Sequence, residues 1–321
     1  MIRPAQTVFL LLDDFSHLAF SCAVEPLRIA NRIAERKIYN WTLASPNGAS
    51  ATCSNGAVTL VSQGLEPLTR DDRLVVVAGE AVQRRASLPV MNYLRRERAR
   101  GVQLGAICSG AYVLARAGLL NGIETAIHWE YHDLMAEEFP DVPVVDGVFA
   151  TAGRIFTAAG GAAVADLMLH LIACDVGQDT ATAVADQMVY SAARDGSAPQ
   201  RASLQARHRV CNIHLLHAIR LMEENLETPL SPSEIAMRIN ISVRQLERLF
   251  SRSLHCTPKR YYLKLRLERA KILILQTELS IAEIAMASGF VSTSHFSKVF
   301  RHHFGYSPIT KRNDMTLKIA S

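Results

Sequence analysis

One cysteine lies where a strand-like run passes directly into a helix-like run. The segment Ala106-Ile-Cys-Ser-Gly-Ala-Tyr112 places Cys108 at this turn, among small residues. The pattern is typical of a nucleophile elbow, which holds a thiol at the end of a strand beside the N–H groups that open a helix. Such N–H groups lower the pKa of a thiol. His128, in Thr125-Ala-Ile-His-Trp129, is a candidate partner if the fold brings it to the thiol.

Two interpretations of Cys108 are open at this level. A thiol enzyme needs a positioned base or acid beside its nucleophile, whereas a small apolar cysteine also fits a tight strand-to-helix turn without doing chemistry. We favour the second interpretation, so we assign no catalytic residue and expect no cofactor. The six cysteines form no CxxC pair and no close metal-ligand spacing, which predicts reduced thiols and no metal site.

Short apolar, β-branched runs alternate with helix-like stretches through the first two hundred residues. The strand-like runs are 8–12, 41–44, 74–78 and 102–107, and the helix-like stretches are 22–36, 82–100 and 109–117. Strands that are apolar along their whole length indicate a parallel sheet buried between helices. We therefore predict an α/β domain, and such sheets bind ligands outside the carboxyl ends of their strands.

Several residues follow these strand ends or flank the elbow, and they are the candidate ligand contacts. They are Asp13, Asp14, Phe15, Glu80, Cys108, Ser109, His128 and Trp129. Carboxylates beside aromatic rings suit a cationic amine through charge pairing and cation–π attraction. We therefore expect a small amine or amino-acid-like effector, with the alternative that Phe15 and Trp129 are ordinary core or interface residues.

The chain repeats itself near its C-terminus. Residues 230–258 and 279–308 share Glu-Ile-Ala-Met, a second helix-like run and a Ser/Thr-Pro ending, at an offset of 49 to 50 residues. Each copy spaces a serine and a glutamate for a capping box, and then places Asn240 or Gly289 at a tight turn. Two helix-turn-helix units on one chain can read two successive major grooves. The repeat therefore predicts a transcription regulator, against the alternative of an all-α bundle with accidental similarity.

The second helix of each copy leaves polar side chains outside its apolar face, where a helix-turn-helix meets DNA. These candidate DNA contacts are Arg244, Gln245, Glu247, Arg248, Thr293, Ser294, Ser297, Lys298 and Arg301. A single helix is predicted over 258–276, and at about 1.5 Å per residue it spans roughly 28 Å. This is near the roughly 34 Å between successive major-groove faces. Residues 206–321 hold 18 Lys/Arg against 9 Asp/Glu, and this basic excess favours binding to double-stranded DNA.

The length of 321 residues predicts two domains. Gly, Ser and Pro cluster around residues 195–203, which indicates a linker. We place an α/β domain at 1–195, a linker at 196–207 and an all-α DNA-binding domain at 208–321. No apolar run approaches the roughly 20 residues of a membrane span, and the N-terminus shows no secretory signal. We expect a cytoplasmic protein without membrane contact, and a homodimer formed through the long apolar helices of the first domain.

Two resemblances cover almost the whole chain. Residues 210–310 resemble the DNA-binding domain of the AraC/XylS family, and the run 284–308 closely matches its signature. Residues 7–175 resemble the PfpI-like, class I glutamine amidotransferase-like superfamily, through the Cys108 elbow, the 118–122 turn, His128 and the run 157–171. Enzymes of that superfamily place a carboxylate against the thiol. The aligned position here is Ala19, and this departure argues against hydrolase or deglycase activity.

The combination resembles a known regulator architecture, the GlxA-like regulators, whose members commonly control catabolism of amines and amino acids such as arginine, carnitine and glycine betaine. The resemblance implies a PfpI/flavodoxin-like effector domain that also mediates oligomerisation, and a C-terminal domain that binds promoter DNA. It further implies activation of catabolic genes, with RNA polymerase as a partner. The alternative is a cysteine-dependent amidase or deglycase-like enzyme that carries a DNA-binding tail.

Overall fold

The computed structural model divides into two compact units, which meet in the sequence between Arg201 and Ala202. It describes residues 5–191, 193–200, 212–277 and 279–312. Residues 201–207 of the predicted linker lie outside the described residues. Each unit has hydrophobic cores of its own. No described helix is long and apolar enough to cross a membrane.

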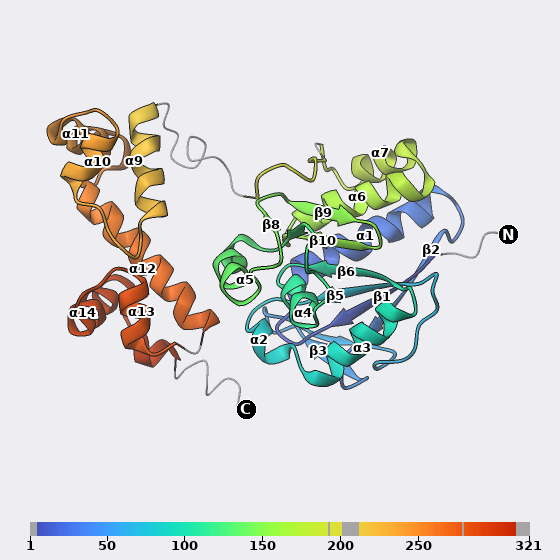
Figure 1. Ribbon diagram of the computed structural model, residues 1–321. Helices are drawn as coiled ribbons and strands as arrows, with labels where there is room; N and C mark the ends of the chain where they lie inside the picture. The colour runs from blue at the N-terminus through green and yellow to red at the C-terminus, as the bar shows by residue number, and fades with distance from the viewer. Residues whose placement is uncertain (1–4, 192, 201–211, 278, 313–321) are drawn as a thin grey trace. The chain divides into compact units, whose positions relative to one another are not determined.

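The first unit is built on a six-stranded sheet (Figure 1). In spatial order its strands are β2 (Tyr39–Ala44), β1 (Ala5–Leu11), β5 (Arg73–Val77), β6 (Gln103–Ile107), β10 (Ile155–Ala158) and β9 (Phe149–Ala152). All neighbouring pairs are parallel except β10 with β9, so the sheet carries one antiparallel edge strand. Two short ribbons accompany it: β3 (Ser50–Thr52) with β4 (Val58–Leu60), and β7 (Thr125–Ala126) with β8 (Val144–Val145). The predicted α/β fold with a mainly parallel sheet is confirmed.

Helices cover both faces of this sheet, and alternate residues of β1 show it. Phe9 and Leu11 belong to the core with α1 (His17–Ile33), α6 (Ala163–Val176) and α7 (Gln178–Gln187). Val8 and Leu10 belong to the opposite core. That core includes residues of α2 (Val82–Arg85), α3 (Leu88–Ala99), α4 (Gly110–Arg116) and α5 (His132–Glu138). Burial on both faces explains why the strands are apolar throughout.

Two predicted helices differ from the observed ones. The stretch 82–100 forms two helices, α2 and α3, and the break lies before Pro89. Proline lacks an N–H and disfavours helical conformation in the preceding residue, so it belongs in the first turn of a new helix. Helix α1 begins at His17 and not near Cys22, because the Ser16 side chain accepts the N–H of Ala19 and caps the helix start.

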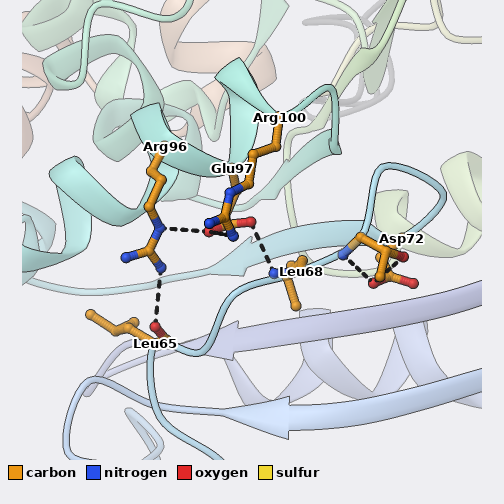
Figure 2. Close-up of polar contacts among 7 residues, drawn as sticks. Leu65, Leu68, Asp72, Arg96, Glu97 and Arg100 are labelled. Atoms are coloured by element: carbon orange, nitrogen blue, oxygen red, sulfur yellow. Dashed lines mark hydrogen bonds and ion pairs between the residues drawn. The ribbon is translucent and has the colours of Figure 1, made fainter.

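A buried carboxylate fixes the long connection between β4 and β5 (Figure 2). The fully buried Glu97 of α3 accepts the Leu68 N–H at 3.0 Å and the Arg96 Nε at 2.8 Å. Arg96 in turn donates to the Leu65 carbonyl at 3.3 Å. The group lies near the amino ends of β5 and β6, so it stabilises the sheet on the side opposite the carboxyl ends of these strands.

The second unit is all helical, as predicted, and consists of two copies joined by one helix (Figure 1). The helices are α9 (Ile213–Glu224), α10 (Pro232–Arg238), α11 (Val243–Leu254), α12 (Pro258–Gln276), α13 (Ile281–Ala287) and α14 (Thr293–Phe304). Capping boxes open α10 at Ser231 and α13 at Ser280. Asn240 and Gly289 occupy the two turns with φ of +55° and +74°. The connecting helix α12 contributes Tyr262 to the first core and Leu267 to the second.

Candidate nucleic-acid interface and effector site

Helix α11 is the second helix of the first helix-turn-helix unit. Ser242 caps it by accepting the N–H of Gln245 at 3.2 Å, and Leu246 and Phe250 are fully buried. The predicted contacts Arg244, Glu247 and Arg248 are exposed. The Gln245 Oε1 accepts the Ser242 N–H at 2.8 Å, so this oxygen completes the cap and only the amide nitrogen remains for a base.

Helix α14 repeats this arrangement in the second unit. Ser292 accepts the His295 N–H at 3.3 Å, and Phe296 and Phe300 are fully buried. Of the predicted contacts, Ser297 is half-buried and the others are exposed, namely Thr293, Ser294, Lys298 and Arg301. His295, which is not among the contacts predicted from the sequence, is exposed and occupies the position that Gln245 has in α11. The repeat could have pointed to this position, because Gln245 and His295 each lie three residues after the serine that caps their helix.

We expect Arg248→Ala to weaken specific DNA binding about 5- to 150-fold, because a good bidentate contact to a base contributes about 1–3 kcal/mol. The measurement is a gel-shift titration against specific and scrambled duplexes at several salt concentrations. Arg220→Ala is the matched control, since Arg220 is an exposed arginine of α9 that pairs with Glu224. Equal losses on specific and scrambled DNA would show that Arg248 contacts only phosphate.

The carboxyl ends of three adjacent strands bring the predicted effector residues together. Asp14 after β1, Ala81 after β5 and Cys108 after β6 have φ of +65°, +51° and +59°. Positive φ is uncommon for residues other than glycine, and such strained conformations cluster at functional sites. The strand ends also approach closely, since a Cβ on Gly79 would lie 2.2 Å from the Asp14 carbonyl oxygen.

Four of the predicted ligand residues have partners or positions that limit their role. Arg85 donates to the Asp14 carboxylate at 2.7 Å and lies 3.7 Å from that of Asp13. The carboxylates of Asp13 and Asp14 are therefore both paired with the Arg85 guanidinium. Phe15 is fully buried and packs edge-on against Phe20, so it is a core residue and not a ligand contact. The buried Ser109 hydroxyl donates to the Gly79 carbonyl at 2.6 Å, which makes its role structural.

The environment of the Cys108 thiol does not activate it, so the N–H groups that open the helix are not the dominant influence on its pKa. Burial raises its pKa to about 11, and this effect outweighs the hydrogen bond from the Ser109 backbone, which acts in the opposite direction. The thiolate is the nucleophilic form, so the thiol is almost entirely protonated at pH 7. The aligned acid position is occupied by the fully buried Ala19.

Glu80 and Glu130 lie near this neutral thiol, and His128 and Trp129 directly precede Glu130 in the chain. The charges of Glu130 and Glu80 also raise the pKa of Cys108, which places both within electrostatic range of it. The rings of His128 and Trp129 lie 5.5 Å apart, and the His128 Nδ1 is 3.7 Å from Glu130. Burial lowers the pKa of His128, and the charge of His132 lowers it further, so His128 is neutral at pH 7. Glu130 was absent from the sequence-based set, although it directly follows Trp129.

The last described residues of the first unit, 193–200, pack back onto that unit. Asp166, which is fully buried, accepts hydrogen bonds from the backbone and the side chain of Arg194. Further along, the Gln200 side-chain amide donates to the carbonyls of Ile127 at 2.9 Å and Gly147 at 3.0 Å. Residues 196–200, which the sequence places in the linker, therefore pack on the first unit, and they end beside His128.

Comparisons with known proteins agree with both units. Residues 5–174 match the DJ-1/PfpI family and residues 235–314 match a helix-turn-helix domain. The chain is 40% identical over 315 residues to the HTH-type transcriptional regulator GbdR of Pseudomonas aeruginosa, covering 98% of this chain and 86% of the relative. It is 41% identical over 310 residues to the HTH-type transcriptional regulator CdhR of the same species, covering 97% of this chain and 92% of the relative.

Among solved structures, the chain resembles an AraC family transcriptional regulator from Pseudomonas putida. The TM-score is 0.52 at 25% identity, and the match covers 58% of this chain and all of that chain. The two family matches taken together, and each of the two Pseudomonas aeruginosa relatives, extend over both units. The protein is therefore a DNA-binding transcriptional regulator of the AraC family whose N-terminal domain belongs to the DJ-1/PfpI family.

Proposed function

We propose that this regulator controls catabolic genes, mainly as an activator, in response to a small cationic amine or amino acid. The candidate effectors are compounds of the arginine, carnitine and glycine betaine class. The observation that carries the proposal is the pair of carboxylates, Glu80 and Glu130, whose charges act on the neutral Cys108 thiol, together with the His128 and Trp129 rings that lie beside Glu130. Carboxylates neutralise an ammonium group, and an aromatic face attracts a quaternary one. From the family resemblance we also propose that the protein acts as a homodimer and that RNA polymerase is its partner in activation.

The first unit acts in this proposal as a receptor and not as an enzyme. A protonated thiol and an alanine at the acid position are poorly suited to nucleophilic catalysis. Effector binding would reach the DNA-binding unit through the segment that ends at Gln200, because this side chain holds the carbonyl of Ile127 next to His128. An effector can shift the equilibrium between two conformational states of the protein only as far as its affinities for these two states differ.

Calorimetry on the full-length protein tests the effector class. Glycine betaine, carnitine and arginine are titrated beside 3,3-dimethylbutanoate, in which carbon replaces the quaternary nitrogen of glycine betaine. We expect at least one of the cationic compounds to bind and the carbon analogue to bind much more weakly. Glu130→Gln should weaken binding, whereas Glu25→Gln on the exposed face of α1 should not. Binding of only neutral or acidic compounds would contradict the proposal.

Cys108→Ser should leave regulation close to the wild-type level. The hydroxyl is of similar size, and like the native thiol it is uncharged at pH 7. Effector-dependent expression from a reporter promoter is the measurement, and Cys174→Ser at an exposed position is the control. If induction were lost while the protein stayed folded, a chemical role for the thiol, and with it the enzyme alternative, would have to be considered.

A further inference from the structure

The two helix-turn-helix units meet at a junction made from three segments of the second unit. These are one face of α12, the loop 225–230 that precedes α10, and the turn 288–290 that follows α13. From α12, the Tyr262 hydroxyl donates to the Asn225 carbonyl at 2.5 Å and accepts the Leu230 N–H at 3.4 Å. Tyr262 thus fastens the loop of the first copy to the connecting helix.

Arg266, one helical turn further along α12, fastens the turn of the second copy. It donates from Nε to the Ser288 carbonyl at 2.9 Å and from Nη2 to the Gly289 carbonyl at 2.5 Å. Its guanidinium also lies 4.1 Å from the centre of the Phe290 ring. The last carbonyls of a helix lack partners within the helix and attract cations, so Arg266 holds the end of α13 at a fixed place on α12.

The loop and the turn also touch each other directly. A Cβ on Gly289 would lie 2.5 Å from the Leu226 carbonyl oxygen and 2.6 Å from the Pro229 Cγ. Positive φ by itself does not demand glycine here, because Asn240 adopts φ of +55° at the matching turn of the first copy. The close approach of the two copies is therefore the reason for glycine at 289.

We propose that this junction sets the spacing and angle of the two recognition helices, α11 and α14. Arg266 and Gly289 act as positioning residues for DNA reading, without a direct contact to DNA. The two cores share no buried residue, and α12 is the continuous element that contributes to both. Without the junction they would be joined mainly through a single helix. Two linked DNA-binding units gain affinity only when their separation matches the spacing of their sub-sites on DNA. The junction therefore makes the protein selective for one spacing of the sub-sites.

Gly289→Asn tests the proposal, because asparagine tolerates the positive φ of the turn but its Cβ separates the two copies. The matched control is Asn240→Gly, which makes the reverse change at an exposed turn. The full-length proteins are titrated against a 40-base-pair duplex, on the order of four helical turns, that the wild type has selected from a random library. Two derivatives change the spacing of the footprinted sub-sites by one base pair either way, and a third scrambles one sub-site.

We expect the wild type and Asn240→Gly to lose about tenfold in affinity when the spacing changes. Gly289→Asn should bind the parent duplex about tenfold more weakly, discriminate little between the three spacings, and bind the scrambled duplex like the wild type. Arg266→Lys keeps the positive charge but loses the paired hydrogen bonds to Ser288 and Gly289, so its affinity and its discrimination between spacings should change in the same direction. This variant tests the proposal if Gly289→Asn does not fold. A folded variant that keeps the wild-type spacing preference, or weakens equally on every duplex, would overturn the proposal.

Discussion

Phe300→Ala is expected to unfold the second helix-turn-helix unit and to abolish sequence-specific DNA binding. Phe300 is fully buried and lies 5.4 Å from the Phe296 ring and 4.6 Å from the Phe304 ring. Removing a buried phenylalanine ring typically costs about 3–5 kcal/mol. This approaches the whole stability of a small domain, about 5–15 kcal/mol. The core around Phe300 has few buried members, so little packing remains to compensate.

Thermal unfolding followed by circular dichroism, together with gel shifts on specific duplexes, measures this effect. The N-terminal α/β unit should keep its own transition, because its cores, as far as the structure describes them, contain no residue of the helical unit. Val291→Ala is the control, since this side chain directly precedes the Ser292 cap and is fully exposed. A Phe300→Ala protein that still bound specific DNA with wild-type affinity would show that the second helix-turn-helix unit does not contribute to recognition.

Removing residues 1–200 should give a fragment that binds DNA and no longer responds to any effector. Among the described residues, the cores of the DNA-binding unit are made only from residues after 212, with their own caps and connecting helix. The net charge of +9 over residues 206–321 supplies the attraction to phosphate. Affinity should therefore fall steeply with salt, by about 10³- to 10⁵-fold between about 50 and 200 mM if 6–10 phosphates are contacted.

Footprinting of residues 201–321 with and without glycine betaine, carnitine and arginine is the measurement. Full-length protein on the same promoter provides the comparison, and its protection pattern should change with the effector. A folded fragment that protects no site at low salt would show that the first unit is needed for DNA binding itself. A fragment whose footprint still changed with an effector would place the effector site outside the first unit.

Local signals in the sequence predicted most of the second unit. The connecting helix was predicted over 258–276 and ends at these residues in the structure. The predicted capping box at Ser231 is present, and Asn240 has the positive φ expected at its turn. Caps, turns and helical periodicity depend on residues within about four positions of each other, so one chain segment contains all the information that they need.

Long-range contacts decided the rest, and the effector site shows why. The strand ends after β1, β5 and β6 could be located from apolar runs, which explains why Asp14, Glu80 and Cys108 could be placed after them. The pairing of Arg85 with Asp13 and Asp14 could not be foreseen, because these residues are about seventy positions apart. The rise in the pKa of Cys108 could not be foreseen from the elbow motif alone, because burial depends on everything packed around the thiol.

The sequence by itself thus determined the two kinds of domain, the duplicated DNA-reading helices and the elbow at Cys108, because each follows from residues close together in the chain. Only the tertiary structure decided which of the polar side chains pair with one another, as Arg85 does with Asp14. It also revealed the antiparallel β9, the attachment of Gln200 beside His128, and the contact of Gly289 with Pro229. These features arise where distant segments meet, and packing and desolvation at such places are properties of the whole fold.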